Sequence, residues 1–438
     1  ARKADDGVGR APITLSAWFA ASAVNRSPAA QRRTIVIAGG GPVGLSIATL
    51  LSSSSHTEDL DIRLFEPRQV PSWVGDTVDL RVYALSRASQ SILENLSVWE
   101  TVAAARVAPY RRMRVWQGEH DARIGSLTFD SSEMGEPDLG HIVEDSLLRT
   151  QLVSALAHTN VELTFGVGLT AIHIGERGVD ITTSEGETLS ATVLVAADGS
   201  ASVVRNLLKM PISTVSYAQR ALVTHVTTEQ PHAETAWQRF LPGGPLAFLP
   251  LDDGRSSVVW STQAEHAEAL CKLDDVEFQT ELQIASGGVL GQLGATVERV
   301  SFPLNAAHAR RYCDSRVALV GDAAHTTHPL AGQGMNLGFL DAAVLSDVFI
   351  DALNRGEDPG DLRVLRRYER RRKGDNLKMV LALDALHRLF QISGSLIPPL
   401  RAVGLSVINV MPLAKAVLMR QALGLRDDLP TAAKPRIA

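Results

Sequence analysis

The chain has 438 residues and a formal net charge of −5, with 45% hydrophobic and 21% charged residues. This composition is ordinary for a globular protein of two to three domains, and the acidic balance excludes a globally basic surface for nucleic acid. The two cysteines, Cys271 and Cys313, provide neither a disulfide framework nor a metal-ligand spacing. They favour inert thiols in a reducing compartment.

The stretch 1–33 is predicted to be a flexible or targeting extension. Its basic residues precede a mildly apolar run, ITLSAWFAASAV, as in a leader peptide. Asp5 and Asp6 argue against a leader, so a disordered or loosely docked extension is favoured. No apolar run in the chain reaches the roughly 18 residues that span a bilayer.

A dinucleotide-binding motif begins the folded part. Residues 34–38 form a β-branched run typical of a buried parallel strand, and Gly39, Gly41 and Gly44 then complete G-x-G-x-x-G before a helical stretch. In this motif the glycines allow a tight turn, the approach of a pyrophosphate to the backbone, and close helix packing. A second strand ends at Glu66, about 20 residues on, where an acid binds a ribose diol.

Two alternatives remain open for this motif. The glycines can form a simple turn with Glu66 solvated. Glu66 also favours the free ribose diol of FAD or NAD over a phosphorylated ribose, but Arg68 lies close by and weakens that distinction.

A second motif follows a strand over 193–197. Asp198 and Gly199 end this strand, and a Ser-rich turn leads to Arg205. The acid can orient polar groups near a nucleotide, or it can serve only as the N-cap of the next helix.

The third motif is GDAAHTTHPLAGQGMNLGFLDA. A strand over 317–320 precedes Gly321 and Asp322, and a helix is predicted from about Met335. Asp322 can bind a chain of hydroxyls, and the N–H groups at the helix start can face a ring carbonyl or developing negative charge. Side chains are small here because the backbone contacts the ligand; close helix packing is the alternative.

His325 and His328 lie in this third motif, three residues apart. Such a pair can ligate zinc, but no third ligand is near in the sequence. A structural or hydrogen-bonding role is therefore favoured, and no metal is predicted.

The three motifs in this order resemble the class A flavoprotein monooxygenases, single-component FAD enzymes of the hydroxybenzoate-hydroxylase type. Further segments resemble the UbiH/VisC-type hydroxylases of ubiquinone biosynthesis: DLRVYALSRASQSILENLSVW, LGHIVEDSLL, QRFLPGGPLAFLPL and RRYERRRKGDN. The resemblance covers roughly residues 34–425. One departure is Asp145, where the family more often has Asn.

The resemblance assigns FAD-binding roles by motif position. They fall to Gly39, Gly41, Gly44 and Glu66 at the ADP half, Arg81, Asp198 and Gly199 at the pyrophosphate, Gly321 and Asp322 at the ribityl chain, and Pro329, Gly332, Gly334, Met335 and Asn336 at the flavin. Arg81 can instead be a surface residue, and Asp198 and Gly199 can also serve the reduced nicotinamide cofactor.

The implied fold is α/β, with a Rossmann-like FAD-binding domain, an inserted β-sheet substrate domain and a helical C-terminus. The expected ranges are 34–110, 139–212 and 308–360 for the FAD domain, 111–138 and 213–307 for the substrate domain, 361–426 for the helical region and 427–438 for the tail. Tyr217, Arg239 and Phe248 are candidates for the wall of the substrate pocket, each with a structural role as the alternative.

The implied activity is hydroxylation of a polyprenylated phenol in ubiquinone biosynthesis, with NAD(P)H and O2, through a flavin C(4a)-hydroperoxide. No base is identified. The alternatives are a hydroxylase of a small soluble aromatic acid, and a flavin-binding scaffold within a ubiquinone-biosynthesis protein complex.

The C-terminal region mixes basic and apolar residues. RVLRRYERRRKGDN has helical character and is typical of a solvated face, and LIPPLRAVGLSVINVMPLAKAVLMRQALGL is too interrupted to span a membrane. This segment can lie on an anionic membrane surface, or pack as a helical subdomain or oligomer contact. We expect a cytoplasmic protein, peripheral on the inner membrane.

Overall fold

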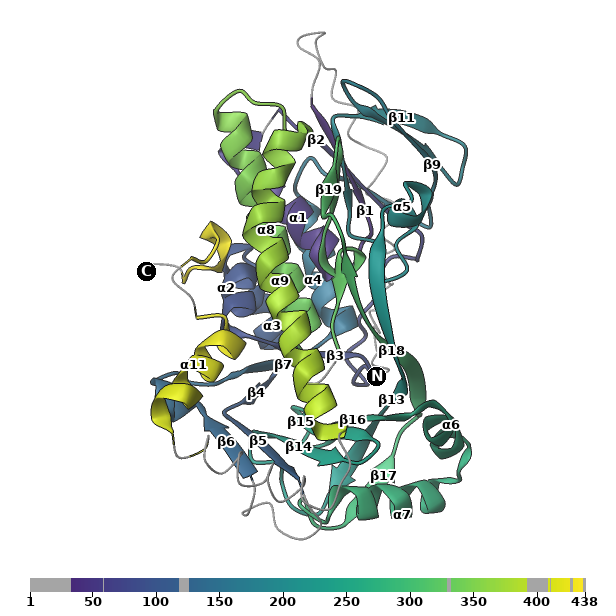
Figure 1. Cartoon of the computed structure of the whole chain (residues 1–438), viewed down its shortest axis with the longest axis vertical. Helices are drawn as coiled ribbons and strands as arrows, with labels where there is room; N and C mark the ends of the chain where they lie inside the picture. The colour runs from purple at the N-terminus through teal and green to yellow at the C-terminus, as the bar shows by residue number, and fades with distance from the viewer. Residues whose placement is uncertain are drawn as a thin grey trace, which may run out of the picture. The chain divides into compact units, whose positions relative to one another are not determined.

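The computed structural model describes residues 33–57, 59–117, 126–328, 332–391, 409, 411–425 and 428–435. The extension predicted before residue 33 and the candidate Pro329 lie outside these residues. The described part is drawn in Figure 1.

A six-stranded sheet carries the first, second and third motifs. Its strands in spatial order are β19 (Cys313–Asp314), β20 (Val317–Leu319), β12 (Val193–Ala196), β1 (Thr34–Ala38), β2 (Asp61–Glu66) and β8 (Glu162–Phe165). All neighbours pair in parallel except β19 with β20. The central strands are buried almost throughout, as a sheet covered on both faces requires.

Helices cover this sheet. They include α1 (Pro42–Ser52), α4 (Asp145–Leu156), α8 (Gln333–Asn354) and α9 (Leu362–Gln391), with α2 (Arg87–Asn95) and α3 (Trp99–Ala105) beside them, whereas α5 (Val203–Leu207) lies next to β9 (Leu169–Ile174). Helices α1 and α8 pack closely, because a Cβ on Gly338 would lie 2.7 Å from Val43 Cγ2. Close helix packing, the alternative for the small residues of the third motif, is therefore present at Gly338.

A second, nine-stranded sheet is built mainly from residues 112–130 and 212–309. It consists of β21 (His325–Thr326), β18 (Val300–Ala309), β13 (Ile212–Thr228), β16 (Ser256–Gln263), β15 (Gly244–Pro250), β14 (Thr235–Leu241), β5 (Arg112–Gln117) and β6 (Ser126–Asp130) in order, with β17 (Leu293–Thr296) paired to β13. The edge strand β21 belongs to the third motif. All the other strands of this sheet come from the ranges proposed for the substrate domain, apart from residues at the ends of β13 and β18.

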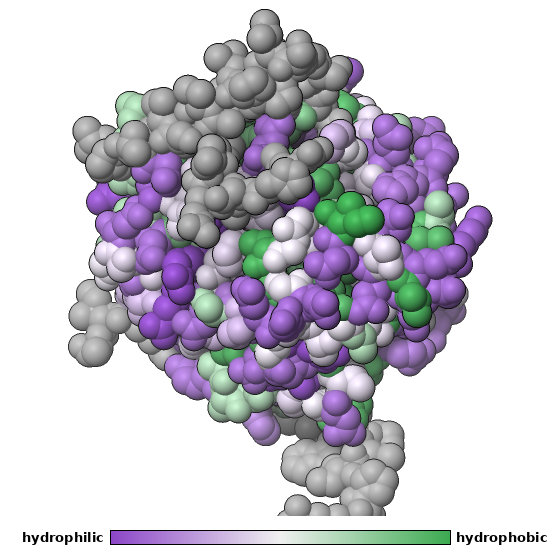
Figure 2. Space-filling model, turned by 90° about the horizontal axis from the view of Figure 1, so that it is seen from below, coloured by the Kyte–Doolittle hydropathy of each residue, from purple (hydrophilic) through white to green (hydrophobic). Residues whose placement is uncertain are grey.

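Two smaller sheets and the remaining helices complete the chain. They are β9 (Leu169–Ile174), β10 (Val179–Thr183) and β11 (Thr188–Ala191); β3 (Val82–Leu85), β7 (Gly140–Glu144) and β4 (Ala108–Tyr110); and α6 (Ala264–Lys272), α7 (Asp275–Ser286) and α11 (Pro412–Leu423). In the view of Figure 2, hydrophobic residues form small groups among hydrophilic ones.

Two findings concern the C-terminal region. The basic run in α9 is not simply a solvated face, because Arg372 is 4% exposed and Asn376 is fully buried. Among the described helices, none is both long and apolar enough to cross a membrane.

Candidate functional site

The first motif forms the turn from β1 into α1. Gly39 has φ of +108°, and a Cβ there would lie 2.3 Å from the Ala197 carbonyl oxygen. A Cβ on Gly44 would lie 2.0 Å from the Gly39 carbonyl oxygen, so both positions require glycine for internal reasons. A Cβ on Gly41 would meet no atom of the described chain within 4 Å. Gly41 therefore leaves open space at the start of α1.

Glu66 ends β2 beside this turn and is 3% exposed. Its carboxylate accepts from the Gly40 backbone N–H at 2.6 Å and from the Arg68 backbone and Nε at 3.0 and 2.7 Å. Burial works to raise the pKa of Glu66, but these hydrogen bonds bring it below the usual value. The Arg68 side chain is 57% exposed, so a ribose diol at Glu66 can displace it.

Arg149 of α4 is a site residue that the motifs did not indicate. It is 8% exposed, its Nε donates to the Gly40 carbonyl at 3.2 Å, and its Nη2 is buried without a hydrogen-bond partner among the described residues. The only sequence signal is an arginine within an otherwise apolar helix face. The neighbouring Asp145 accepts a hydrogen bond from the Tyr83 hydroxyl at 2.6 Å.

Arg81 precedes β3 and is exposed. Its guanidinium lies 5.5 Å from the centroid of the Tyr83 ring. Hydrogen bonds and ion pairs of this guanidinium are absent within the described part of the chain, so its donors remain available for an anion.

The second motif lies at the end of β12. Asp198 Oδ2 accepts from the Val204 backbone N–H at 3.0 Å, so the acid does support the start of α5. Its Oδ1 is buried without a partner in the described chain. Burial raises the pKa of Asp198, although hydrogen bonds from Ser202 and the backbone oppose this. Gly199 adopts φ of +81°, which turns the chain after the strand.

Asp322 follows Gly321 in the short turn after β20. Its carboxylate makes no hydrogen bond to the described residues. Burial raises the pKa of Asp322, against the attraction of His325 and Arg81. The influence of Arg81 indicates that these two side chains, which come from distant segments, lie near each other.

The N-terminus of α8 lies next to Asp322. A Cβ on Gly334 would lie 3.9 Å from Asp322 Oδ1, and the N-cap Gly332, with φ of +60°, supplies no capping side chain. Met335 is half-buried against the core. The first backbone N–H groups of α8 thus have no side-chain cap.

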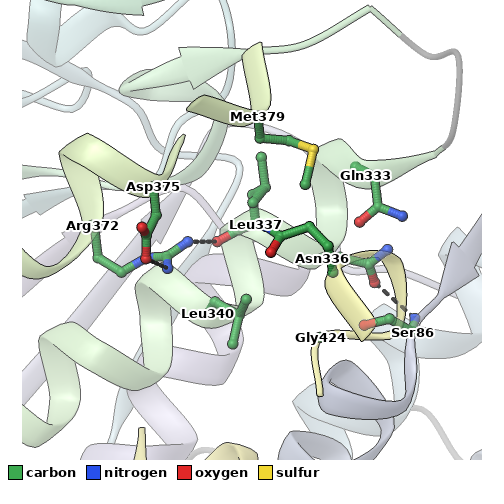
Figure 3. Close-up of a pocket in the computed structure, with 10 residues that line it drawn as sticks. Ser86, Gln333, Asn336, Leu337, Leu340, Arg372, Asp375, Met379 and Gly424 are labelled. Atoms are coloured by element: carbon green, nitrogen blue, oxygen red, sulfur yellow. Dashed lines mark hydrogen bonds and ion pairs between the residues drawn. The ribbon is translucent and has the colours of Figure 1, made fainter. Parts of the chain in front are cut away.

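The Asn336 side chain holds this end of α8 in place. Its Oδ1 accepts from the Ser86 backbone N–H at 2.9 Å and the Ser89 hydroxyl at 2.7 Å, and its Nδ2 donates to the Ala84 carbonyl at 3.0 Å. Figure 3 shows Asn336 directed toward Ser86. Any contact from Asn336 to a ligand is therefore made by its backbone.

The three substrate-wall candidates lie in different surroundings. Tyr217 of β13 donates to Asp384 Oδ1 of α9 at 3.0 Å, and its ring contacts those of His328 and His387 edge-on at 4.9 and 4.7 Å. The second candidate, Arg239, donates to the Ala285 carbonyl at the end of α7 at 2.8 Å.

Phe248 is fully buried in a cluster with residues of α6 and α7. Arg239 and Phe248 thus serve the attachment of these helices. We retain Tyr217 for the proposed substrate wall.

The two histidines of the third motif do not converge. His325 Nε2 lies 2.6 Å from Asp341 Oδ2, whereas His328 stacks on His387 at 4.5 Å. Within the described ranges, no group of three or more His, Cys, Asp or Glu side chains could hold a metal ion.

Comparison with known proteins identifies the family. Residues 32–380 match the model of the FAD-binding domain family. The chain is 35% identical over 400 residues to the 3-demethoxyubiquinol 3-hydroxylase of Escherichia coli, covering 90% of this chain and 99% of that protein. It is 33% identical to the mitochondrial ubiquinone biosynthesis monooxygenase COQ6 of Danio rerio, covering 94% and 96%. The chain belongs to the FAD-dependent aromatic-ring monooxygenases.

A solved structure supports the fold of this monooxygenase. The p-nitrophenol 4-monooxygenase PnpA of Pseudomonas putida superposes with a TM-score of 0.73 at 17% identity, covering 90% of this chain and all of that one. The predicted α/β fold, with a parallel sheet and a helical C-terminus, is confirmed, as are the FAD-dependent family and enzyme class.

The residues present in the monooxygenase fit FAD. Gly41 offers open space where a pyrophosphate approaches, and Arg149 and Asp198 each keep a buried polar atom without a partner in the described chain. Arg81 and Asp322 add a cation and a carboxylate without hydrogen bonds to the described residues. These groups suit phosphate oxygens and sugar-like hydroxyls respectively.

Proposed function

We propose that this monooxygenase hydroxylates the aromatic ring of a polyprenylated phenol in ubiquinone biosynthesis, using O2 and NAD(P)H. The observation that carries the proposal is the match to a demethoxyubiquinol hydroxylase along 99% of that protein's length. Because the match covers 90% of this chain, it extends beyond the cofactor motifs.

The residues of the chain would bind and orient the reactants. Gly39, Gly41, Gly44, Glu66 and Gly199 would hold the nucleotide part of FAD, with Arg81, Arg149 and Asp198 near the pyrophosphate and Gly321, Asp322, Pro329, Gly332, Gly334, Met335 and Asn336 at the ribityl chain and ring. Bound FAD supplies the oxygen-activating chemistry. Tyr217 would form part of the wall that orients the phenol and excludes water.

Gene removal and rescue test this proposal. The host gene is deleted, and the accumulated lipids are identified by quinone extraction and mass spectrometry. We expect the deletion strain to accumulate a prenylated phenol that lacks one hydroxyl. The native gene should restore ubiquinone, whereas an Asp322→Asn variant of proven low FAD content should not. Normal ubiquinone without any accumulating intermediate would instead favour a small soluble aromatic acid as substrate.

The helical C-terminus is proposed to contact an anionic membrane surface, where a polyprenyl tail resides. On α9 the side chains of Leu377, Leu381, Leu386 and Leu389 are exposed, and on α11 those of Val417 and Leu418 are exposed. Lys378 and Arg388 beside them are 82% and 65% exposed. Exposed apolar residues with flanking cations suit a lipid surface. The segment 392–408 lies outside the described residues.

Vesicle flotation tests the membrane contact. Binding to anionic vesicles should exceed binding to zwitterionic ones, and a Leu381→Ser/Leu389→Ser variant should lose most of it. The matched control, Val276→Ser/Ile284→Ser, removes two apolar residues of α7 that are even more exposed. Equal loss of vesicle binding in both variants would contradict the proposal.

A complex with other ubiquinone-biosynthesis enzymes is also proposed. Co-purification of such enzymes with the tagged chain tests it.

A further inference from the structure

A buried carboxylate links the third motif to the two long helices. Asp341 of α8 is fully buried and uses both of its oxygens. Oδ2 accepts from the Gly321 backbone N–H at 3.1 Å and lies 2.6 Å from His325 Nε2. Oδ1 accepts from Arg372 Nε at 2.6 Å and from Asn376 Nδ2 at 2.9 Å. Four donors from two segments, residues 321–325 and α9, therefore meet at one side chain of α8.

Asp341 interacts with a cationic side chain and a histidine. Burial would raise the pKa of Asp341, but His325 and Arg372 hold it well below its usual range. Arg372 is fixed in turn by Asn376 Oδ1 at 2.7 Å, and its Nη2 also points to the Leu337 carbonyl, as Figure 3 shows. A buried carboxylate with a cationic partner and hydrogen bonds to both of its oxygens is costly to alter on one side only.

Asp322 contrasts with this neighbour, because its own carboxylate has no hydrogen bond to the described residues. Its direction therefore depends on its backbone. The preceding residue, Gly321, adopts φ of +60° and donates its N–H to Asp341. The turn from which Asp322 projects is thus held by this bond to Asp341, together with the bonds from the Ala324 N–H to the Gly321 carbonyl at 2.8 Å and from Arg205 Nη1 to the Ala323 carbonyl at 3.0 Å.

We propose that Asp341 is a positioning residue, which acts through the Gly321 N–H to aim the Asp322 carboxylate at the hydroxyl chain of FAD. The inference rests on the proposed cofactor contact of Asp322. It also gives Arg372 and Asn376 of α9 a role, since they hold Asp341 from the side opposite the turn.

A double-mutant cycle on FAD affinity tests the proposal. The dissociation constant is measured by flavin fluorescence titration for the wild type, Asp322→Asn, Asp341→Asn and the double variant. Each single change should weaken binding roughly tenfold or more, and the double variant should bind about as weakly as Asp322→Asn alone, because residues that act as one unit are not additive. The absorbance spectrum of bound flavin should change alike in the two single variants.

Asp347→Asn is the matched control. Asp347 lies on the same helix, but its carboxylate accepts from the Thr431 backbone N–H, away from the turn. The factor by which Asp347→Asn changes the FAD dissociation constant should multiply with the factor for Asp322→Asn. If Asp341→Asn does not fold, Asn376→Ala, which removes one donor from the cluster, takes its place in the cycle.

Two results would overturn the proposal, and they differ. If the factors by which Asp322→Asn and Asp341→Asn raise the FAD dissociation constant multiply in the double variant, as in the control, Asp341 only supports the core. An Asp322→Asn variant with wild-type FAD affinity would remove the cofactor contact itself, and the role of Asp341 with it.

Discussion

At the scale of single residues, Gly41 and Gly44 offer the sharpest comparison in the cofactor site. Gly41 has φ of −76° and open space at its Cβ position, whereas a Cβ on Gly44 would overlap the Gly39 carbonyl. Gly41→Ala should therefore fold with stability equal to the wild type or raised by about 0.4–1 kcal/mol, yet bind FAD at least about tenfold more weakly.

Gly44→Ala is its counterpart and should lose about 1–3 kcal/mol of stability or more from overpacking. Thermal unfolding of the FAD-free protein and flavin titration measure the two effects separately. Wild-type FAD affinity in Gly41→Ala would place the pyrophosphate elsewhere.

Arg149 carries the second residue-scale prediction. Its unpartnered Nη2 lies buried beside the dinucleotide turn, so Arg149→Met should raise the FAD dissociation constant by about 10- to 100-fold, as expected for a lost hydrogen bond to a charged group. Arg106→Met is the control, because Arg106 is engaged by Glu144 at 2.8 Å. Equal losses of FAD affinity in both variants would indicate a general disturbance rather than a phosphate contact.

At the scale of elements, Arg239 joins the nine-stranded sheet to the end of α7. Because its guanidinium donates to the Ile284 and Ala285 carbonyls, Arg239→Met should lower the unfolding free energy by about 1–3 kcal/mol and leave KM for the phenol unchanged. Tyr217→Phe, next to His328, should instead change the kinetic constants. Chemical denaturation and steady-state kinetics separate these effects, and a raised KM with unchanged stability in Arg239→Met would return this residue to the substrate wall.

The same elements show what local sequence could predict. Gly39 and Gly44 are required by backbone atoms close to them in the structure, so the spacing of the glycines in the sequence was enough to predict the turn and the helix packing. The partners of Asp341 are Gly321, His325, Arg372 and Asn376, which meet only after α8 and α9 pack. The basic run, which is typical of a solvated face, therefore gave no sign of its two buried polar residues, Arg372 and Asn376, and Arg149 belongs to no motif.

At the scale of the whole molecule, the proposed FAD site draws on segments that are far apart in the chain. The turns after β1, β12 and β20 lie at the ends of neighbouring parallel strands, where ligands bind in such sheets. Helix α9 connects this region to the surface. Arg372 and Asn376 face the Asp341 cluster, Asp384 and His387 contact Tyr217, and Leu381 and Leu389 are exposed. One helix therefore contacts the cofactor layer, the proposed substrate wall and the proposed lipid surface.

Stability should fall in mild acid because buried histidines stay neutral in the folded chain. Burial lowers the pKa of His225 to about 4 and of His328 to about 3. Since the unfolded value is about 6.5, the unfolded chain binds more protons below that pH. The stabilisation is complete above pH 6.5 and is lost as the pH falls toward the folded values, at about 1.4 kcal/mol per pH unit for each histidine.

His225→Gln isolates one of these contributions. Both ring nitrogens of His225 are buried without partners in the described part of the chain, so a neutral amide should reduce the slope of unfolding free energy against pH between 5 and 6 by up to about 1.4 kcal/mol per unit. His173→Gln, at an exposed position, should leave the slope unchanged. Urea unfolding at saturating FAD, from pH 5 to 8, measures both variants. A wild-type slope in His225→Gln would mean that His225 already binds its proton in the folded state, and the acid sensitivity would then have to arise from His328 and His387 at the junction of the loop and α9.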